Sequence, residues 1–446
     1  MLVDLLRRFH RDRTGNVAVI FALSLIPGIF LIGMSLDFAS AMQRRSLLNA
    51  AADAAALAAV RPPMMQQSAS AAQTAATKMF NAQASAVGGV TSATPTVTVT
   101  TNGLTRTVTV SYTASSSNNF PSVLGQNTWS LSGTSTATAS TAPNIDFYLL
   151  LDNSPSMELP ATSAGITAMI NATKNAPSSG GNANGCAFAC HESSPSADNL
   201  GNPGGIDNYQ LAQNLGVVLR IQNMASATQS LMSTASATMA ANNATYRAAI
   251  YTFNTGGANT IQTLTSSLAT AQTSAGNIDV LLVYSNNYLT KSNNNNDTDT
   301  DFATAMSNLN GIMPNPGTGA SNSTPQEVLF IVSDGVEDKV SSTCSQTKVG
   351  SNRCQQPFDI TWCTKIKNRG ILIAVLYTEY LPLPSSGVGS NSWYNSYVAP
   401  YQAQIGPNLQ NCASPGLYFA VTTDGDITSA MNTLFQQAVT TARLSN

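Results

Sequence analysis

The side chains best suited to chemistry in this sequence are two aspartates, each at the end of an apolar run. Asp152 opens the string Asp-Asn-Ser-Pro-Ser, so Ser154 and Ser156 lie in the same short loop. Asp334 stands in the string Ser-Asp-Gly after a second apolar run. Carboxylate and hydroxyl oxygens are the hard donors that Mg²⁺ binds at about 2.0–2.1 Å, whereas softer metals favour nitrogen or sulfur. We therefore expect a site for a divalent cation.

A third loop adds further hydroxyl groups. Residues 297–301 read Asp-Thr-Asp-Thr-Asp and directly precede a helical stretch at residues 303–312. Thr298 and Thr300 are both candidates, and one such hydroxyl would complete an octahedral set of oxygens around Mg²⁺. The alternative for the serine loop is that its polar side chains only cap the start of a helix.

Continuous apolar runs place these loops at the ends of strands. Such runs are typical of strands covered on both faces, and helical stretches separate them. The expected strands are 145–151, 248–253, 328–332, 371–377 and 417–421, and the main helices are 209–241, 303–312 and an amphipathic one near the C-terminus. This alternation predicts an α/β domain at residues 144–446 with a doubly wound, mostly parallel sheet, whose strand ends present the ligands.

Two long polar segments interrupt this domain, at about residues 160–207 and 382–413. They exceed ordinary connections, so we expect insertions that are either functional or decorative. All six cysteines lie after the apolar N-terminal stretch: Cys186, Cys190, Cys344, Cys354, Cys363 and Cys412. An even number in an exported region predicts three disulfides, with free thiols as the alternative. The sequence does not choose among the possible pairings.

An apolar stretch near the N-terminus predicts a single membrane anchor. Residues 17–36 contain no charged residue and are long enough to cross about 30 Å of hydrocarbon. Four arginines precede the stretch, whereas two more follow only after Asp37, and this bias places the N-terminus in the cytoplasm. A cleaved signal peptide is the alternative, but Asp37-Phe38 is not a small-residue cleavage site.

Beyond the anchor, the sequence predicts a stalk and then a small β-rich region. An Ala-rich stretch continues the helix until a Pro-Pro pair, where proline prevents continuation, so residues 1–61 form the anchor and stalk. Over residues 96–113, valines alternate with threonines on both sides of Asn102-Gly103, which predicts a β-hairpin. Trp129 suggests a further strand before a Thr/Ser/Ala-rich linker or edge strand. Residues 62–143 are therefore the β-rich region and linker.

The composition excludes several classes of function. Charged residues make up only 9% of the chain and the net charge is -2, so no basic face is available for nucleic acid. His10 and His191 are the only histidines, which leaves little scope for a histidine triad or a histidine-rich zinc site. Cys186 and Cys190 precede His191 with three residues between them, where haem attachment needs two. We therefore expect no haem.

Together, the three loops resemble the metal-ion-dependent adhesion site of von Willebrand factor A domains, over about residues 144–446. The resemblance implies that two serines and one threonine bind the ion directly, that the aspartates act mostly through water, and that an open position accepts an acidic ligand. The corresponding residues are Asp152, Ser154, Ser156, Thr300 and Asp334. Thr300 is preferred to Thr298 because of its spacing to Met306 in the family's pattern. The chain departs from the family in lacking the glycine pair that often precedes the threonine, and Pro155 stands where glycine is frequent.

The N-terminal region carries a second resemblance. The string Arg-Thr-Gly-Asn-Val-Ala-Val-Ile-Phe-Ala-Leu over residues 13–23, then Leu36-Asp37, then the Ala-rich stretch from Arg44 is similar to the anchor of TadE/TadG-like tight-adherence (Flp) pilus-assembly proteins. Its union with a C-terminal A domain is similar to TadG-type proteins. The resemblance implies a bacterial inner-membrane protein whose bulk faces the periplasm and assists pilus biogenesis.

These patterns predict a membrane-anchored binding protein of pilus assembly or adhesion. It would recognise an acidic group on a protein partner through Mg²⁺, or alternatively Mn²⁺ or Ca²⁺, and we expect it not to be an enzyme. A metal-assisted hydrolase is the first alternative, but no general base is evident beside the two acids. The second alternative is a structural envelope protein with a silent metal site.

Overall fold

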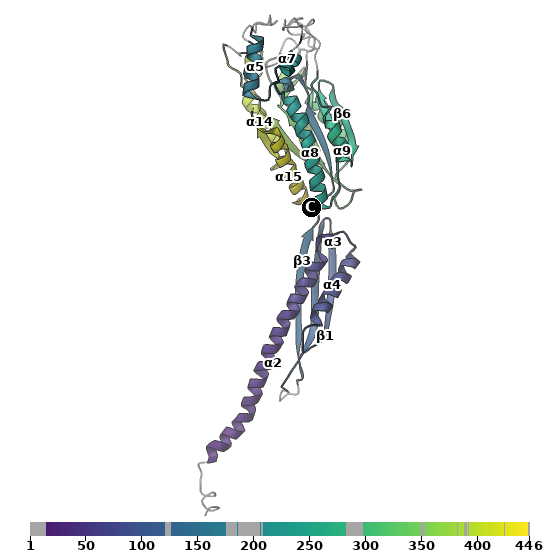
Figure 1. The fold of residues 1–446 in the computed structure, drawn as a ribbon, viewed down its shortest axis with the longest axis vertical. Helices are drawn as coiled ribbons and strands as arrows, with labels where there is room; N and C mark the ends of the chain where they lie inside the picture. The colour runs from purple at the N-terminus through teal and green to yellow at the C-terminus, as the bar shows by residue number, and fades with distance from the viewer. Residues whose placement is uncertain are drawn as a thin grey trace, which may run out of the picture. The chain divides into compact units, whose positions relative to one another are not determined.

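A computed structural model describes residues 15–120, 126–174, 185, 206, 208–281, 298–348, 353–380, 382–387, 390, 392–422 and 424–444 of the chain. The chain divides into two compact units, Met1–Thr141 and Ala142–Asn446. Figure 1 shows the elements of both units. The expected helical stalk and the strands of the expected β-rich region both belong to the first unit.

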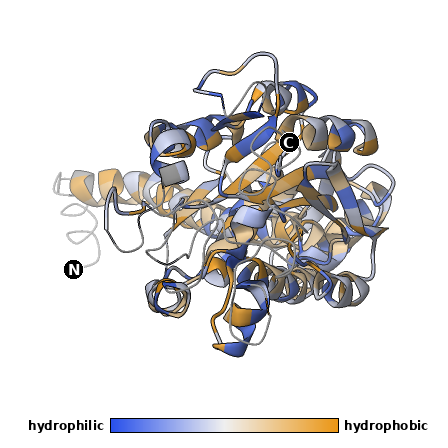
Figure 2. Cartoon of the chain, turned by 90° about the horizontal axis from the view of Figure 1, so that it is seen from above, coloured by the Kyte–Doolittle hydropathy of each residue, from blue (hydrophilic) through white to orange (hydrophobic). Residues whose placement is uncertain are grey.

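The first unit begins with α2, a single helix over Gly15–Ala59 that continues through Pro27. The apolar side chains of its N-terminal half are exposed, and this part of α2 is drawn largely in orange in Figure 2. The hydroxyls of Ser24 and Ser35 donate to carbonyls of the preceding helical turn at 2.9 and 2.8 Å, so they need no water. Among the described residues, α2 is the one helix long and apolar enough to cross a membrane.

The remainder of the first unit is a three-stranded antiparallel sheet packed against α2 and α4. Its elements are α3 (Pro62–Met65), α4 (Ala69–Ala84), β1 (Val90–Asn102), β2 (Thr105–Ser117) and β3 (Thr128–Ser140), with strand order β1-β2-β3. The predicted hairpin is confirmed, because Asn102 pairs with Thr105 and Gly103 has a φ of 56°, which glycine adopts without strain. Phe80 and Val110 are fully buried between the sheet and the helices.

The second unit is built on a six-stranded sheet with strand order β11-β10-β7-β4-β5-β6. Its strands are β4 (Ile145–Asp152), β5 (Tyr246–Asn254), β6 (Gly257–Thr265), β7 (Gln326–Ser333), β10 (Leu372–Thr378) and β11 (Tyr418–Val421). All neighbours are parallel except β5 and β6. The predicted α/β class and the mostly parallel, doubly wound sheet are confirmed, and each predicted apolar run is a strand.

Helices cover both faces of this sheet. They are α5 (Ser163–Thr173), α7 (Asn208–Asn214), α8 (Arg220–Asn242), α9 (Leu268–Ala275), α11 (Phe302–Ile312), α12 (Thr361–Asn368), α13 (Ser392–Tyr397), α14 (Gln402–Cys412) and α15 (Ile427–Leu444). Phe147 and Leu149 of β4 pack with α8, α9 and α15, whereas Tyr148 and Leu150 pack with α11, α12 and α14. Successive strand side chains point to opposite faces, so a strand apolar throughout must be covered twice.

The predicted helix over residues 209–241 is wrong in its continuity. The structure has α7 and α8 in its place, separated by a turn in which Gly216 has a φ of 67°. A glycine in the left-handed region is a common helix end, and Gly216 N donates to Gln213 O as α7 closes. The apolar pattern continues across this turn, which is why the sequence suggests one helix. The break gives Arg220 its place at the start of α8.

Two disulfides are present among the described residues. Cys344 is bonded to Cys354, and Cys363 is bonded to Cys412. The second bond ties α12 to the end of α14, so the segment expected as an insertion at 382–413 contains helices fixed to the rest of the unit. Cys186 and Cys190 lie outside the described residues, and the third predicted disulfide stays a prediction.

Candidate metal centre

Asp152 is the last residue of β4 and its side chain is completely buried. Its Oδ1 accepts a hydrogen bond from Ser154 N at 2.9 Å, and its Oδ2 accepts one from Ser333 Oγ at 2.5 Å. Strand β4 pairs with β7 so that Leu151 lies opposite Val332, which puts Asp152 beside Ser333. The carboxylate is therefore fixed at the carboxyl edge of the two central strands.

The serine loop turns sharply after Asp152. Ser154 precedes a short 3-10 helix over Pro155–Glu158, and proline at its first position fixes the φ that such a helix requires. Ser154 is buried and Ser156 half-buried, and their hydroxyl oxygens lie 3.0 Å apart. Two hydroxyls so close together can bind one ion. Pro155, a departure from the family's pattern, is thus compatible with the expected geometry.

Asp334 follows directly after β7 and is also completely buried. Its Oδ1 accepts a hydrogen bond from Val336 N at 3.2 Å, whereas no donor among the described residues meets hydrogen-bond geometry at Oδ2. Gly335 has a φ of 79°, and a Cβ added there would lie 2.5 Å from Ile405 of α14. Only glycine fits, which explains the Ser-Asp-Gly string.

The two buried carboxylates perturb each other. The pKa of Asp152 is raised to about 7, mainly by burial and also by the charge of Asp334, against the opposing hydrogen bonds from Ser154 and Ser333. Burial also raises the pKa of Asp334, against the opposing effects of Ser156, Val336 and Arg220. Charged groups out of water are costly unless paired. A cation bound between the two acids would remove that cost.

Arg220 places one positive charge near this pair. It is the first residue of α8 and is buried, and its Nη2 donates to Glu379 O at 2.8 Å. Its Nη1 has no hydrogen-bond partner among the described residues. The guanidinium lowers the pKa of Asp334 against the larger effect of burial. Two carboxylates and one guanidinium leave the site with about one negative charge when all three are ionised.

Thr300 lies at the same edge of the sheet. It is 3% exposed, and it exchanges two backbone hydrogen bonds of 2.9 Å with Asp338. The next residue, Asp301, caps α11 and donates from its backbone to Asn254 O at 3.2 Å, and Asn254 in turn donates to Asn153 Oδ1 at 3.1 Å. These bonds tie the threonine loop to the loop that holds Asp152.

Thr298 has a different environment. Its hydroxyl lies 3.2 Å from the hydroxyl of Thr255, and its side chain is half-buried. Thr300 is thus the more deeply buried of the two threonines, and its role as a ligand stays a prediction.

A hairpin that the sequence analysis missed holds Thr300 in place. It consists of β8 (Val336–Val340) and β9 (Arg353–Pro357). Within it, Asp338 accepts hydrogen bonds from Arg353 Nε at 2.8 Å and from Gln355 Nε2 at 2.7 Å. Its strands are short and polar, so no apolar run predicted them; the Cys344–Cys354 bond closes the hairpin.

The donor set fits a hard divalent cation. It offers two carboxylates and three hydroxyls. One carboxylate oxygen, Asp334 Oδ2, accepts no hydrogen bond among the described residues. No group of three His, Cys, Asp or Glu side chains that could hold a metal occurs in the described part of the chain, so hydroxyls must complete the coordination. Mg²⁺ prefers such oxygen ligands.

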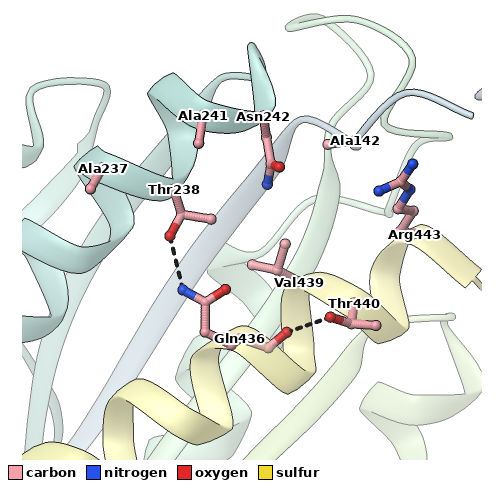
Figure 3. A pocket seen from close by; sticks show the side chains of 9 residues that line it. All are labelled: Ala142, Ala237, Thr238, Ala241, Asn242, Gln436, Val439, Thr440 and Arg443. Carbon is pink, nitrogen blue, oxygen red and sulfur yellow. Dashed lines mark hydrogen bonds between the residues drawn. The ribbon is translucent and has the colours of Figure 1, made fainter. Parts of the chain in front are cut away.

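A cavity of about 470 Å³ elsewhere in the second unit is unsuited to a cation. Its lining side chains come from α8 and α15 with Ala142, as Figure 3 shows, and Gln436 Nε2 donates to Thr238 Oγ1 at 2.9 Å. The lining contains no carboxylate and one cation, Arg443. The cavity lies near Asn242, the last residue of α8. Arg220, the first residue of this helix, is about 33 Å away along the helix axis. The cavity is not part of the candidate metal centre.

Comparisons with known proteins bear mainly on the N-terminal region. Residues 15–82 match the family model described as putative Flp pilus-assembly TadE/G-like, which confirms the resemblance of the N-terminal region to TadE/TadG-like proteins. No curated protein sequence matches the chain.

The chain is also similar to several solved structures at low identity. One is the PilB minor pilin from Streptococcus sanguinis, with 12% identity over 79% of this chain and 78% of that chain and a TM-score of 0.33. Another is the pilus adhesin SpaC from Lactobacillus rhamnosus GG, with 10% identity over 78% of this chain and 34% of that chain and a TM-score of 0.32. A third is the SpRpn10 VWA domain, with 9% identity over 66% of this chain and 95% of that chain and a TM-score of 0.31.

Proposed function

We propose that this chain, whose residues 15–82 form a TadE/G-like Flp pilus-assembly segment, is a membrane-anchored binding protein of the pilus system. Its second unit recognises an acidic group on a protein partner through a bound divalent cation. The family match supports the pilus system, and helix α2 supports the anchor.

The observation that carries the binding function is the pair of fully buried carboxylates at one sheet edge. Asp152 and Asp334 are both without exposure, and no lysine or arginine forms an ion pair with either among the described residues. Burying two acids side by side is unfavourable unless a cation joins them. Side chains used only for helix capping do not require this arrangement.

The cation would be held by Ser154, Ser156 and Thr300, with Asp152 and Asp334 acting directly or through water. When bound, it supplies a positive centre that attracts a carboxylate of the partner. Neutral hydroxyl ligands neutralise little of its charge, so the ion keeps its attraction for an incoming acid. Mg²⁺ is the first candidate, with Mn²⁺ and Ca²⁺ as alternatives.

The orientation follows from the distribution of arginines. Those before residue 17 outnumber those directly after the apolar stretch, which favours a cytoplasmic N-terminus. The second unit then lies outside the inner membrane, in the oxidising compartment where its disulfides are stable. Its partner is a pilus or envelope component.

Cation titration with matched variants tests this proposal. The full chain in detergent micelles should bind Mg²⁺ or Mn²⁺ in a calorimetric titration. Asp152→Ala and Thr300→Ala should weaken binding by at least about tenfold, and Thr298→Ala should change it much less. Circular dichroism should show the same fold in all variants, because the changes lie at the carboxyl end of the sheet and not in its apolar core.

The partner is tested with envelope extracts. Capture by the parent chain should require the cation and should be lost in chelator and in Asp152→Ala. If Asp152→Ala captures the same partner as well as the parent chain, in chelator as in Mg²⁺, the metal-bridged mechanism is wrong and the second unit is a structural domain with a silent site.

A further inference from the structure

The sheet of the first unit covers α2 over a stretch that reaches into the apolar span. Gly33, Asp37 and Ala41 are buried and spaced four residues apart, so they mark one face of the helix. Gly33 lies within the uncharged stretch of residues 17–36, about 6 Å along the helix from Asp37. The first unit therefore begins to cover α2 at Gly33, before the apolar stretch ends at residue 36.

Residues 118–120, which follow β2, make this contact. A Cβ added at Gly33 would lie 3.0 Å from Phe120 Cβ, so the ring of Phe120 packs directly over the glycine backbone. The twenty residues from 17 to 36 span about 30 Å, which matches the hydrocarbon thickness of a bilayer. When this span fills the membrane, Phe120 lies at the depth of the outermost acyl-chain segments.

The carboxylate of Asp37 accepts hydrogen bonds from backbone N–H groups of the loop that contains Phe120. Its Oδ1 accepts a hydrogen bond from Asn119 N at 2.8 Å, and its Oδ2 accepts one from Phe120 N at 3.0 Å. Irregular backbone is tolerated at membrane depth only where its polar groups are paired within the protein. The two bonds pair the N–H groups of Asn119 and Phe120 in this way, and they shield the carboxylate, which is 3% exposed.

The side chains around this contact are those of a membrane interface. Phe120 is 44% exposed and Phe38 49%, and the ring of Phe38 meets that of Trp129 edge-on at 5.7 Å. Tryptophan gathers where headgroups meet acyl chains, and exposed phenylalanine inserts at the same boundary. Arg44 and Arg45 lie about 10–12 Å further along α2 than Asp37, on the aqueous side of a headgroup layer that is about 5–8 Å thick, and their long side chains can reach back toward it.

The arginines are held by the same sheet. Arg44 Nη1 donates to Ser116 Oγ at 2.8 Å and to Ser117 O at 2.7 Å, and Arg45 Nε donates to Ser132 O at 3.1 Å. Apolar, aromatic and cationic side chains thus follow one another in the order of the layers of a bilayer.

We propose that this end of the small sheet is seated in the bilayer surface, with Phe120 among the outer acyl chains and Arg44 and Arg45 on the aqueous side of the phospholipid headgroups. The occupant of the exposed aromatic face is therefore lipid. This depends on the anchoring function of α2 and is independent of the cation site.

Quenching by brominated lipids tests the proposal. The full chain has three tryptophans, so Trp129→Phe, Trp362→Phe and Trp393→Phe give a dark background for a single probe. The probes are Phe120→Trp and, at the opposite end of the sheet, the exposed Asn102→Trp. Each is reconstituted in vesicles of phosphatidylethanolamine and phosphatidylglycerol that contain lipids brominated near the glycerol end of the acyl chain.

Phe120→Trp should be quenched several-fold more strongly by these lipids than Asn102→Trp, and aqueous iodide should reverse the order. Adding Asp37→Ala should reduce quenching of Phe120→Trp while the chain stays in the vesicles. Equal bromolipid quenching of the two probes, or protection of Phe120→Trp from both quenchers, would overturn the proposal, since the second result places protein over the loop. Failure to float with the vesicles would instead contradict the anchor itself.

Discussion

Glu327 gives a quantitative test of the physical description of the second unit. It lies on β7 beside Asp146 of β4, which lies beside Arg247 of β5. Asp146 accepts hydrogen bonds from Arg247 Nε at 2.6 Å and Nη2 at 2.5 Å. Glu327 is 1% exposed, and neither of its carboxylate oxygens has a hydrogen-bond partner among the described residues. Arg247 is paired with Asp146, and the carboxylate of Glu327 is buried without such a partner among the described residues.

The pKa of Glu327 is raised from 4.5 to about 8, mainly by burial and also by the charge of Asp146, while Arg247 and Arg369 oppose the shift. Below pH 4.5, both the folded and unfolded states carry the proton and no penalty arises. Between pH 4.5 and about 8 the unfolded state loses the proton while the folded state keeps it, so the free energy of unfolding falls as pH rises. The full shift corresponds to a loss of about 3–5 kcal/mol.

Glu327→Gln removes the titrating group with little change in volume. Unfolding is measured with guanidinium between pH 5 and pH 8 on the full chain in micelles, with Trp129→Phe in the background so that Trp362 and Trp393 report on the second unit alone. The variant should become more stable than the parent as pH rises, by up to about 3–5 kcal/mol at pH 8.

Asp426→Asn is the matched control. Asp426 is an exposed acid at the start of α15 whose pKa is lowered by hydrogen bonds from Ser429. Asp426 is ionised in both the folded and the unfolded protein between pH 5 and pH 8. The effect of Asp426→Asn on the free energy of unfolding should therefore not vary over that range. If the difference between Glu327→Gln and the parent is the same at pH 5 and pH 8, the account of Glu327 as a buried, unpaired acid is wrong.

Three further predictions concern the disulfides, the cation site and the topology. Breaking Cys363–Cys412 by serine substitution should lower the free energy of unfolding by about 4 kcal/mol and breaking Cys344–Cys354 by about 3 kcal/mol, because the loops close over 49 and 10 residues; equal losses in guanidinium unfolding would contradict the loop-entropy argument. Arg220→Gln should tighten Mg²⁺ binding by about tenfold, because one positive charge near the acids is removed; calorimetry showing weaker binding would refute this. A C-terminal alkaline phosphatase fusion should be active and a fusion to a reporter active only in the cytoplasm should be inactive, and the reverse pattern would contradict a cytoplasmic N-terminus.

Most of the sheet could be predicted because its strands are buried on both faces. Residues 147–151 and 328–332 are apolar throughout, and this pattern has few explanations other than a strand in a doubly covered sheet. The edge strand β6 was missed, since its sequence from Gly257 to Thr265 is polar and half-exposed. Helix α4 was missed as well, because its buried face consists of three alanines and Phe80, a weak apolar signal.

The candidate site divides in the same way. Asp152, Ser154 and Ser156 lie in one loop, so their proximity is local, and Asp334 could be added because parallel strands end at the same edge. Arg220 and Ser333 reach the site only through the packing of α8 and the pairing of β4 with β7. No spacing in the sequence encodes those contacts.

The place where the chain enters the second unit has a mechanical consequence. The segment from the first unit leads directly into Ile145, the first residue of β4, and Asp152 at the other end of this strand is the candidate cation ligand. A pull between the anchor and a partner bound at the cation would therefore run along β4. Its hydrogen bonds to β5 and β7 on both sides would be loaded in shear and would have to break together, so the strand that carries the load is the one held on both sides by the sheet.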